Sequence, residues 1–101
     1  MRKLLFCLFA LGLSATSLYA DECKGKTVEG KKEGTWVCFY ENGKKREEGA
    51  YKTDVKVGAW KYFHENGTVA MEGNYIKGVE KGKWKMFDEA GKLLEEIDYG
   101  K

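Results

Sequence analysis

The sequence contains no proline, a single histidine (His64) and, beyond residue 20, neither serine nor glutamine. A serine nucleophile and a metal site built from several histidines are therefore excluded for that part of the chain. A large excess of charge of one sign is also missing, because 18 basic residues stand against 16 acidic ones. Nucleic-acid binding draws on such an excess, so we expect no nucleic-acid partner. The length of 101 residues allows one small domain.

The N-terminal segment 1–20 has the pattern of a secretory signal peptide. Arg2 and Lys3 precede an apolar run from Leu4 to Leu13, and a stretch of mostly small residues ends at Ala20. The run has about half the length that a membrane-spanning helix needs, which makes a membrane anchor the weaker alternative. We predict cleavage near Ala20 and export to the periplasm or the exterior. Loss of the two basic residues would leave a neutral chain.

Cleavage would also leave two cysteines, Cys23 and Cys38. An even pair in a small exported protein is a candidate disulfide, and a buried unpaired Cys38 is the alternative. If 25–28 pairs with 35–40 around a bend near residues 30–32, Cys23 lies within one residue of the position opposite Cys38. Such a bond would contribute about 3 kcal/mol in the chain-entropy model.

A repeat with a period of about 24 residues occupies the rest of the chain, with seven columns identical in three copies and no insertion. The columns begin at Gly34, Trp36, Phe39, Glu41, Gly43, Glu48 and Tyr51 and recur at this same interval in the second and third copies. We divide the chain into a signal peptide (1–20), an N-terminal half repeat (21–33) and three repeats (34–57, 58–81 and 82–101), the last four forming one repeat domain (21–101).

Each copy predicts two β-strands joined by a tight turn. The first strand is short and aromatic (36–40, 60–63 and 84–87), and the second spans 44–51, 68–75 and 92–99. Asn-Gly at 42–43 and 66–67 can supply two residues with positive φ for a hairpin turn, and Ala-Gly at 90–91 is a weaker version. Short charged linkers then give an antiparallel meander. A helix over 88–99 is the alternative, and the gap-free alignment with the other copies argues against it.

The predicted fold class is therefore all-β, a meander of repeated β-hairpins in one open or curved sheet. Alternation along the strands separates two aromatic rows on opposite faces. The proposed repeat core is Trp36, Trp60, Trp84, Tyr51, Tyr75 and Tyr99, and the possible binding face is Phe39, Phe63 and Phe87. A bend or bulge could instead bring both rows into one buried seam.

Glycines recur at two kinds of position. Gly43, Gly67 and Gly91 are expected in the turns with positive φ. The Gly34 column precedes the tryptophan strand, where a neighbouring ring or a bend would require a missing side chain.

The residues carry no catalytic signature, and we predict no enzymatic activity, no metal and no cofactor. His64 precedes Glu65, which invites a general-base interpretation, but Tyr40 and Asp88 replace His64 in the other copies. The column of Glu48, Glu72 and Glu96 could bind cations, although neighbouring lysines favour a solvated ion-pair face. Acidic residues at 95, 96 and 98 predict an edge strand that is protected from association with other sheets.

The unit Gly-x-Trp-x-x-Phe/Tyr, followed by Asn-Gly-x and Glu-Gly-x-Tyr, resembles the MORN repeat in its bacterial variant, found in chains of the YwqK-type antitoxin family. The resemblance covers about 34–99, with a half unit at 24–33. It implies an extended sheet of stacked hairpins that binds proteins or, in some members, membrane lipids. We therefore expect an exported non-enzymatic module that binds a protein partner. Binding of membrane lipid or cell-wall glycan, and antitoxin-like inhibition of a toxin protein, are the alternatives.

Overall fold

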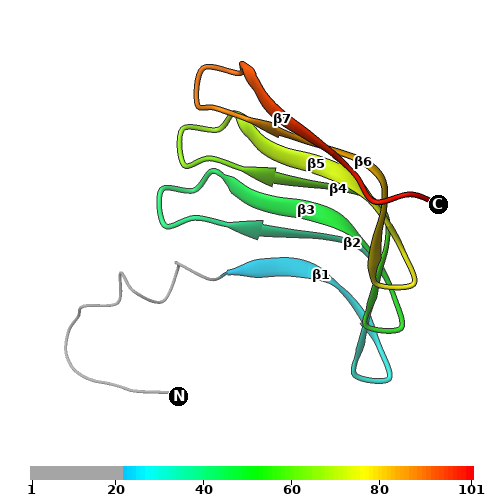
Figure 1. Cartoon of the computed structure of the whole chain (residues 1–101). Helices are drawn as coiled ribbons and strands as arrows, with labels where there is room; N and C mark the ends of the chain where they lie inside the picture. Colours follow the sequence, from blue (N-terminus) through cyan, green and yellow to red (C-terminus); the bar gives the residue numbers. More distant parts are fainter. Residues whose placement is uncertain (1–21) are drawn as a thin grey trace.

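The computed structural model describes residues 22–101 as one seven-stranded antiparallel sheet whose strands follow each other in chain order (Figure 1). The strands are β1 (Cys23–Val28), β2 (Lys31–Phe39), β3 (Lys45–Lys52), β4 (Val55–Phe63), β5 (Val69–Ile76), β6 (Val79–Phe87) and β7 (Leu93–Asp98). The all-β meander is confirmed, and the segment that could have been a helix contains β7. Within residues 22–101 no helix occurs that could cross a membrane. The predicted signal peptide lies outside the described residues.

The turns with two positive-φ residues are not where the sequence predicts them. They join β1 to β2 at Glu29-Gly30, β3 to β4 at Thr53-Asp54 and β5 to β6 at Lys77-Gly78, in segments that the sequence pattern assigns to bends or linkers. Both central residues of each turn have φ between 50° and 84°, as a two-residue hairpin connection requires. The strands reach these turns, so β2, β4 and β6 are each 9 residues long and begin before their predicted starts.

The Asn-Gly prediction was wrong in its geometry. Gly43 alone has a positive φ, of 87°, and its N–H donates to the carbonyl of Tyr40 at 3.0 Å. The Asn42 side chain accepts the N–H of Lys44 at 2.9 Å. Asn42 itself is not among the residues with a positive φ. The result is a longer loop with glycine at its left-handed position. Gly67 and Gly91 have the same sign of φ in the other two copies.

Each long strand is bent at the glycine that precedes its tryptophan. Gly34, Gly58 and Gly82 have φ of 76°, 73° and 71°, and a Cβ at any of them would meet nothing within 4 Å. A bend, and not a neighbouring ring, therefore explains this column. The pairing register is interrupted beside these positions, for example between Glu48 and Ala50 on β3. The hairpin ends turn away from the rest of the sheet at the right of Figure 1.

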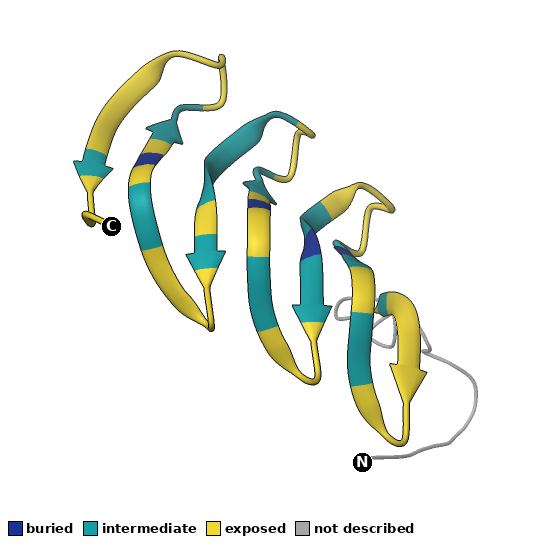
Figure 2. Cartoon of the chain, turned by 90° about the vertical axis from the view of Figure 1, so that its right-hand side faces the viewer, coloured by how far each residue is buried: buried dark blue, intermediate teal, exposed yellow. Residues whose placement is uncertain are grey.

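The core is thin because the described residues form a single layer. The buried apolar side chains are Trp60, Trp84 and Cys38, with 1%, 2% and 8% of their surfaces exposed. Figure 2 shows the buried residues as isolated dark bands on strands that are otherwise half-buried or exposed. Contacts between successive strands must therefore supply most of the stability, as in other repeat arrays.

Candidate functional site

The bent face of the sheet holds an aromatic corner, which we define as Trp36, Trp60, Trp84, Tyr51, Tyr62, Tyr75 and Tyr99. The ring of each tryptophan covers a glycine of the preceding strand, and a Cβ on Gly25, Gly49 or Gly73 would overlap it. The indole N–H donates to the next backbone carbonyl of that strand, for example from Trp60 to Ala50 at 3.1 Å. Each tryptophan therefore requires a glycine in the hairpin before its own.

The rings of the aromatic corner contact one another across the copies. Tyr51 lies edge-on between Trp36 and Trp60, with ring centroids 6.3 and 5.2 Å away. Tyr75 lies in the same way between Trp60 and Trp84, at 5.9 and 5.0 Å. Edge-to-face pairs of this kind contribute about 0.5–1.5 kcal/mol beyond their buried area. The predicted tryptophan and tyrosine residues therefore form one continuous row.

The aromatic corner contains one Trp–Tyr pair per copy: the first corner is Trp36 with Tyr51, the second is Trp60 with Tyr75, and the third is Trp84 with Tyr99. Lysines lie over the first two corners. The Lys32 ammonium is 5.2 Å from the ring centroid of Trp36 and 5.0 Å from that of Tyr51. The Lys56 ammonium is 4.8 Å from Trp60 and 5.3 Å from Tyr75. These distances are within the range of cation–π attraction. The lysines of the chain itself therefore provide the cations that lie over these ring faces.

Lys56 also belongs to a phenol cluster. Its ammonium donates to the Tyr62 hydroxyl at 3.0 Å, and the hydroxyls of Tyr62 and Tyr75 are 2.9 Å apart. Burial raises the pKa of both phenols, and for Tyr75 the hydrogen bond with Tyr62 raises the pKa further. Burial likewise raises the pKa of Tyr51. The phenols therefore remain neutral packing and hydrogen-bonding groups well above neutral pH.

The phenylalanine row is separate from the aromatic corner. Phe39, Phe63 and Phe87 pair with Lys45, Val69 and Leu93 next to register interruptions, and their side chains are half-buried. Within residues 22–101, the contacts between aromatic rings join only tryptophan and tyrosine. A single buried seam is therefore not formed, while a binding role for this row stays a prediction.

The same face as the phenylalanine row carries a row of alternating charges. Directly paired neighbours across β3 to β7 define this charge row, which consists of Glu48, Lys61, Glu72, Lys85 and Glu96. Opposite charges in paired positions stabilise a sheet modestly. The glutamate column thus alternates with lysines, as an ion-pair face requires. No group of acidic, histidine or cysteine residues in 22–101 could hold a metal ion.

At the loop end, side chains of one copy reach the backbone of the next. The Tyr40 hydroxyl donates to the carbonyl of Phe63, and Nε2 of His64 lies 2.9 Å from the carbonyl of Phe87. The Asn42 and Asn66 side chains donate to the carbonyls of Glu65 and Glu89 at 2.8 and 3.0 Å. His64 therefore occupies a structural position between copies.

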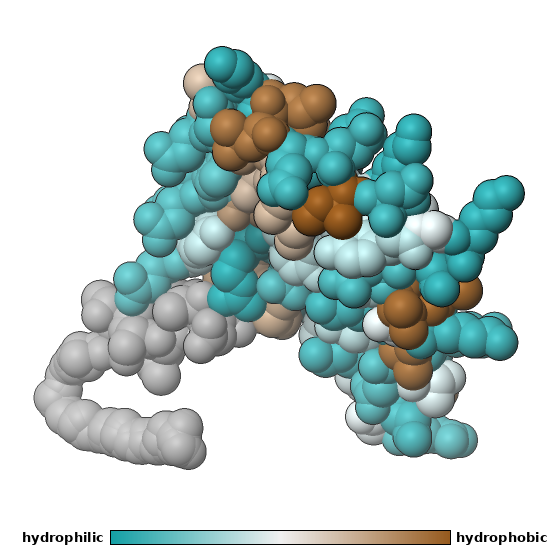
Figure 3. All heavy atoms as spheres, in the orientation of Figure 1, coloured by the Kyte–Doolittle hydropathy of each residue, from teal (hydrophilic) through white to brown (hydrophobic). Residues whose placement is uncertain are grey.

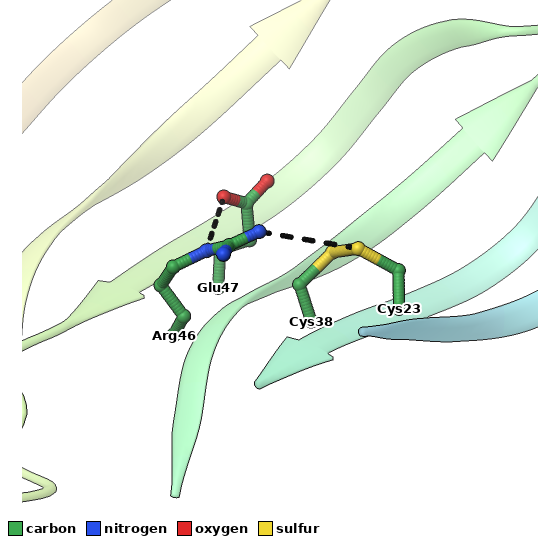
Figure 4. Close-up of a disulfide and its surroundings, with 4 residues drawn as sticks. All are labelled: Cys23, Cys38, Arg46 and Glu47. Carbon is green, nitrogen blue, oxygen red and sulfur yellow. Dashed lines mark hydrogen bonds and ion pairs between the residues drawn. A yellow bond between two sulfur atoms is a disulfide. The ribbon is translucent and has the colours of Figure 1, made fainter. Parts of the chain in front are cut away.

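A disulfide joins Cys23 on β1 to Cys38 on β2, and the two residues lie directly opposite each other in the sheet (Figure 4). Arg46 lies beside it, with Nη2 4.0 Å from Sγ of Cys23 and Nε 3.6 Å from the Glu47 carboxylate. The bond spans a sequence separation of 15 and ties the half repeat to the first full copy. The prediction placed Lys24 opposite Cys38 and was off by one residue at the disulfide. The turn at Glu29-Gly30 shifts the pairing by three residues from the predicted one, and the interruption between Gly25 and Lys26 shifts it back by two.

At the other end of the sheet, β7 pairs only with β6 among the described strands. Leu93 and Leu94 have 50% and 63% of their surfaces exposed. Apolar atoms gather at the top of the molecule in Figure 3, where β7 lies. The remaining residues of this strand include Glu95, Glu96 and Asp98, so an apolar start is followed by an acidic edge.

Sequence reasoning missed the role of the glycines that lie beneath the tryptophans. Gly25, Gly49 and Gly73 share the repeat period, but the series stops at Ile97, so it is not identical in three full copies. The replacement of glycine by isoleucine at position 97 was the signal in the sequence that could have identified this role. Ile97 is half-buried and pairs with Trp84, and β7 has no following tryptophan strand within the described chain.

A family model for the MORN repeat variant matches residues 32–53, 56–77 and 80–101. No curated protein matches the chain. The three matches together cover more than half of the sequence, so the chain belongs to the MORN repeat variant family. Repeats of this family are generally binding modules and are typically not catalytic.

Proposed function

We propose that this member of the MORN repeat variant family is an exported, non-enzymatic module that binds another protein by accepting one of its strands at the β7 edge. The single observation that carries the proposal is that β7 combines an unpaired strand edge with exposed leucine side chains. This strand lies at the end of the sheet and exposes Leu93 and Leu94 beside an edge without a partner strand in the described chain. A strand edge offers main-chain hydrogen bonds to an extended segment of another chain.

The aromatic corner is a weaker candidate for the binding surface. Trp60 and Trp84 have only 1% and 2% of their surfaces exposed, and Lys56 already occupies the space over the Trp60 and Tyr75 rings. Stacking of a glycan or insertion into a lipid headgroup region would need free ring faces. The engaged rings therefore favour a protein partner over lipid or glycan.

Export is supported by the order of residues in 1–20 and by the disulfide. Disulfides persist in oxidising compartments and are rare in the cytosol, and Cys23 is paired with Cys38. Inhibition of a toxin would be a special case of the proposed function, in which the protein bound at β7 is a toxin. Secretion can be checked by comparing the mass of the protein recovered from the cell envelope with that expected after cleavage at Ala20.

Position-dependent cross-linking tests where the partner binds. A photoreactive residue replaces Leu94 in one variant and Glu65 in a matched control, since Glu65 is an exposed residue of the loop between β4 and β5. We expect one protein from the envelope fraction to be cross-linked at position 94 and not at position 65. Equal cross-linking at both positions, or recovery of lipid or peptidoglycan alone, would contradict binding at the β7 edge.

A further inference from the structure

We infer that the β7 edge selects a cationic extended segment of its protein partner, one with a small or β-branched side chain beside Ile97. The inference rests on the proposed function, because it names the chemistry of the strand that β7 would accept. Two independent observations support it, namely the charge at the end of the charge row and the identity of residue 97.

The charge row ends on a carboxylate. Lys61 has a paired glutamate on each side, and Glu72 has a paired lysine on each side. Glu96 pairs with Lys85 on β6, and its other side faces the open edge of β7. The next strand in the row would therefore stabilise the sheet by placing a cation beside Glu96. Asp98, on the same face of the strand, adds to this preference.

Ile97 restricts the shape of the incoming strand. In the two preceding hairpins the equivalent residues are Gly49 and Gly73, and the next strand lays a tryptophan ring over each of them. The side chain of Ile97 occupies that space, so another tryptophan strand of this repeat cannot pack on β7 in the same way. A side chain without a large ring is compatible with Ile97.

The acidic edge also argues against a second β7 as the occupant. Antiparallel pairing of two β7 strands would bring Glu95, Glu96 and Asp98 of one copy close to the same acids of the other. Like charges in opposed positions destabilise a sheet and act against edge-to-edge association. Repulsion of identical edges and attraction of a basic strand follow from the same three residues.

The test uses synthetic peptides and the purified protein with its disulfide formed. The probe has the sequence of β4, Val-Lys-Val-Gly-Ala-Trp-Lys-Tyr-Phe, with valine in place of tryptophan. In the register that β4 adopts on β3, its second lysine would lie beside Glu96, as Lys61 lies beside Glu48. A control peptide has glutamate at both lysine positions. Fluorescence anisotropy at low and high salt measures the two affinities.

We expect the basic peptide to bind at least about fivefold more tightly than the acidic one at low salt, with the difference reduced at high salt. Glu96→Lys should reverse the preference, whereas the matched loop variant Glu65→Lys should leave it unchanged. Ile97→Gly should allow the peptide that retains tryptophan to bind, while the unaltered protein rejects it. Circular dichroism confirms that each variant is folded.

The possible outcomes separate the two proposals. Equal binding of basic and acidic peptides would overturn the charge selection and leave strand addition intact. Failure of every peptide to bind a folded protein would overturn strand addition, and the selection with it. Self-association that Glu96→Lys abolishes, measured by sedimentation of the protein alone, would identify a second copy as the occupant and overturn the assignment to another protein.

Discussion

The second and third copies have nearly the same backbone but differ in how their loops bond to neighbouring chain. In the second copy, His64 and Asn66 bond to backbone carbonyls of the third. In the third copy the equivalent residues are Asp88 and Ala90, and the Asp88 carboxylate instead accepts the N–H groups of Ala90 and Lys92 in its own loop, at 2.9 and 2.8 Å. The second copy thus uses its loop side chains to bond to the next copy, whereas the third uses the Asp88 side chain to bond within its own loop.

The difference extends to the bent face. Gly73 leaves room for the ring of Trp84, whereas Ile97 fills the corresponding place on β7. Lys56 lies over the second corner, and Glu80 stands at the equivalent position of the third. Within the described chain no further copy packs on the third one, and we call this copy the cap. A terminal repeat must satisfy its outer surface without a neighbour, and its composition departs from the consensus for that reason.

The glycines beneath the tryptophans should show the largest effect. We expect Gly73→Ala to lower the free energy of unfolding by about 3 kcal/mol, because a Cβ at this position would lie 2.1 Å from the buried Trp84 ring and displace it. Ile97→Ala, at the equivalent position of the cap, should cost only about 1–2 kcal/mol, because Ile97 is half-buried. Urea denaturation measures both. A Gly73→Ala protein as stable as the unaltered one would show that the ring can move without cost.

The contact at His64 should have an intermediate effect. His64→Asp transplants the residue of the cap into the second copy and removes the bond to the carbonyl of Phe87. We expect a loss of about 1 kcal/mol in the free energy of unfolding. Asp88→Asn is the matched control, since it retains an acceptor for the loop N–H groups and should be neutral. Equal losses in the two variants would show that the link between copies contributes nothing specific.

The third corner has an acidic residue where the second has its lysine, and this difference predicts a gain. Trp84 and Tyr99 have ring centroids 6.4 Å apart, close to the 5.9 Å of Trp60 and Tyr75. We expect Glu80→Lys to stabilise the protein by about 0.5–1 kcal/mol, because the ammonium can lie over these rings as Lys56 does over the second corner. Glu89→Lys, on an exposed loop, controls for the change in net charge and should not raise the melting temperature.

The phenol cluster of the second corner predicts a small dependence on pH. The folded-state pKa values of Tyr62 and Tyr75 lie above the ordinary tyrosine value of 10.0. The unfolded chain would release these protons first, so stability should be constant below about pH 10 and fall as pH rises further. Tyr62→Met, which introduces the equivalent of Met86, should make this fall shallower. Urea midpoints between about pH 8 and 11 test it, and an unchanged slope would contradict the assignment.

Much of the fold could be predicted because the repeat makes the pattern visible three times. Identical columns of Trp, Phe and Tyr with period-two alternation indicate strands, two faces and a meander. The turns were less predictable. Asn42-Gly43 has the composition of a two-residue turn, but the Asn42 amide bonds instead to its own loop and to Glu65 of the next copy. Thr53-Asp54 lacks the composition of such a turn, yet both of its residues have positive φ angles. The backbone N–H of Asp54 donates to the carbonyl of Lys32 in the preceding hairpin.

The candidate site was less accessible still. The sequence predicts that the acidic residues of β7 protect an edge, but their place at the end of an alternating row depends on the register of five strands. Ile97 could be identified as a cap only after Trp60 and Trp84 were seen to cover the glycines of the hairpins before them. That contact joins residues of different hairpins, and no local pattern indicates it.

By itself, the sequence determined the repeat length, the strand order, the chemical character of each face and the pairing of its two described cysteines as neighbours, because these follow from periodicity and from connections too short to cross. Only the tertiary structure decided which glycines bend the strands and which lie beneath a ring. It also decided which lysines make cation–π contacts and which carboxylate of the charge row faces the edge that β7 leaves unpaired among the described strands. These features depend on the register between strands, where a shift of one residue moves every side chain to the opposite face.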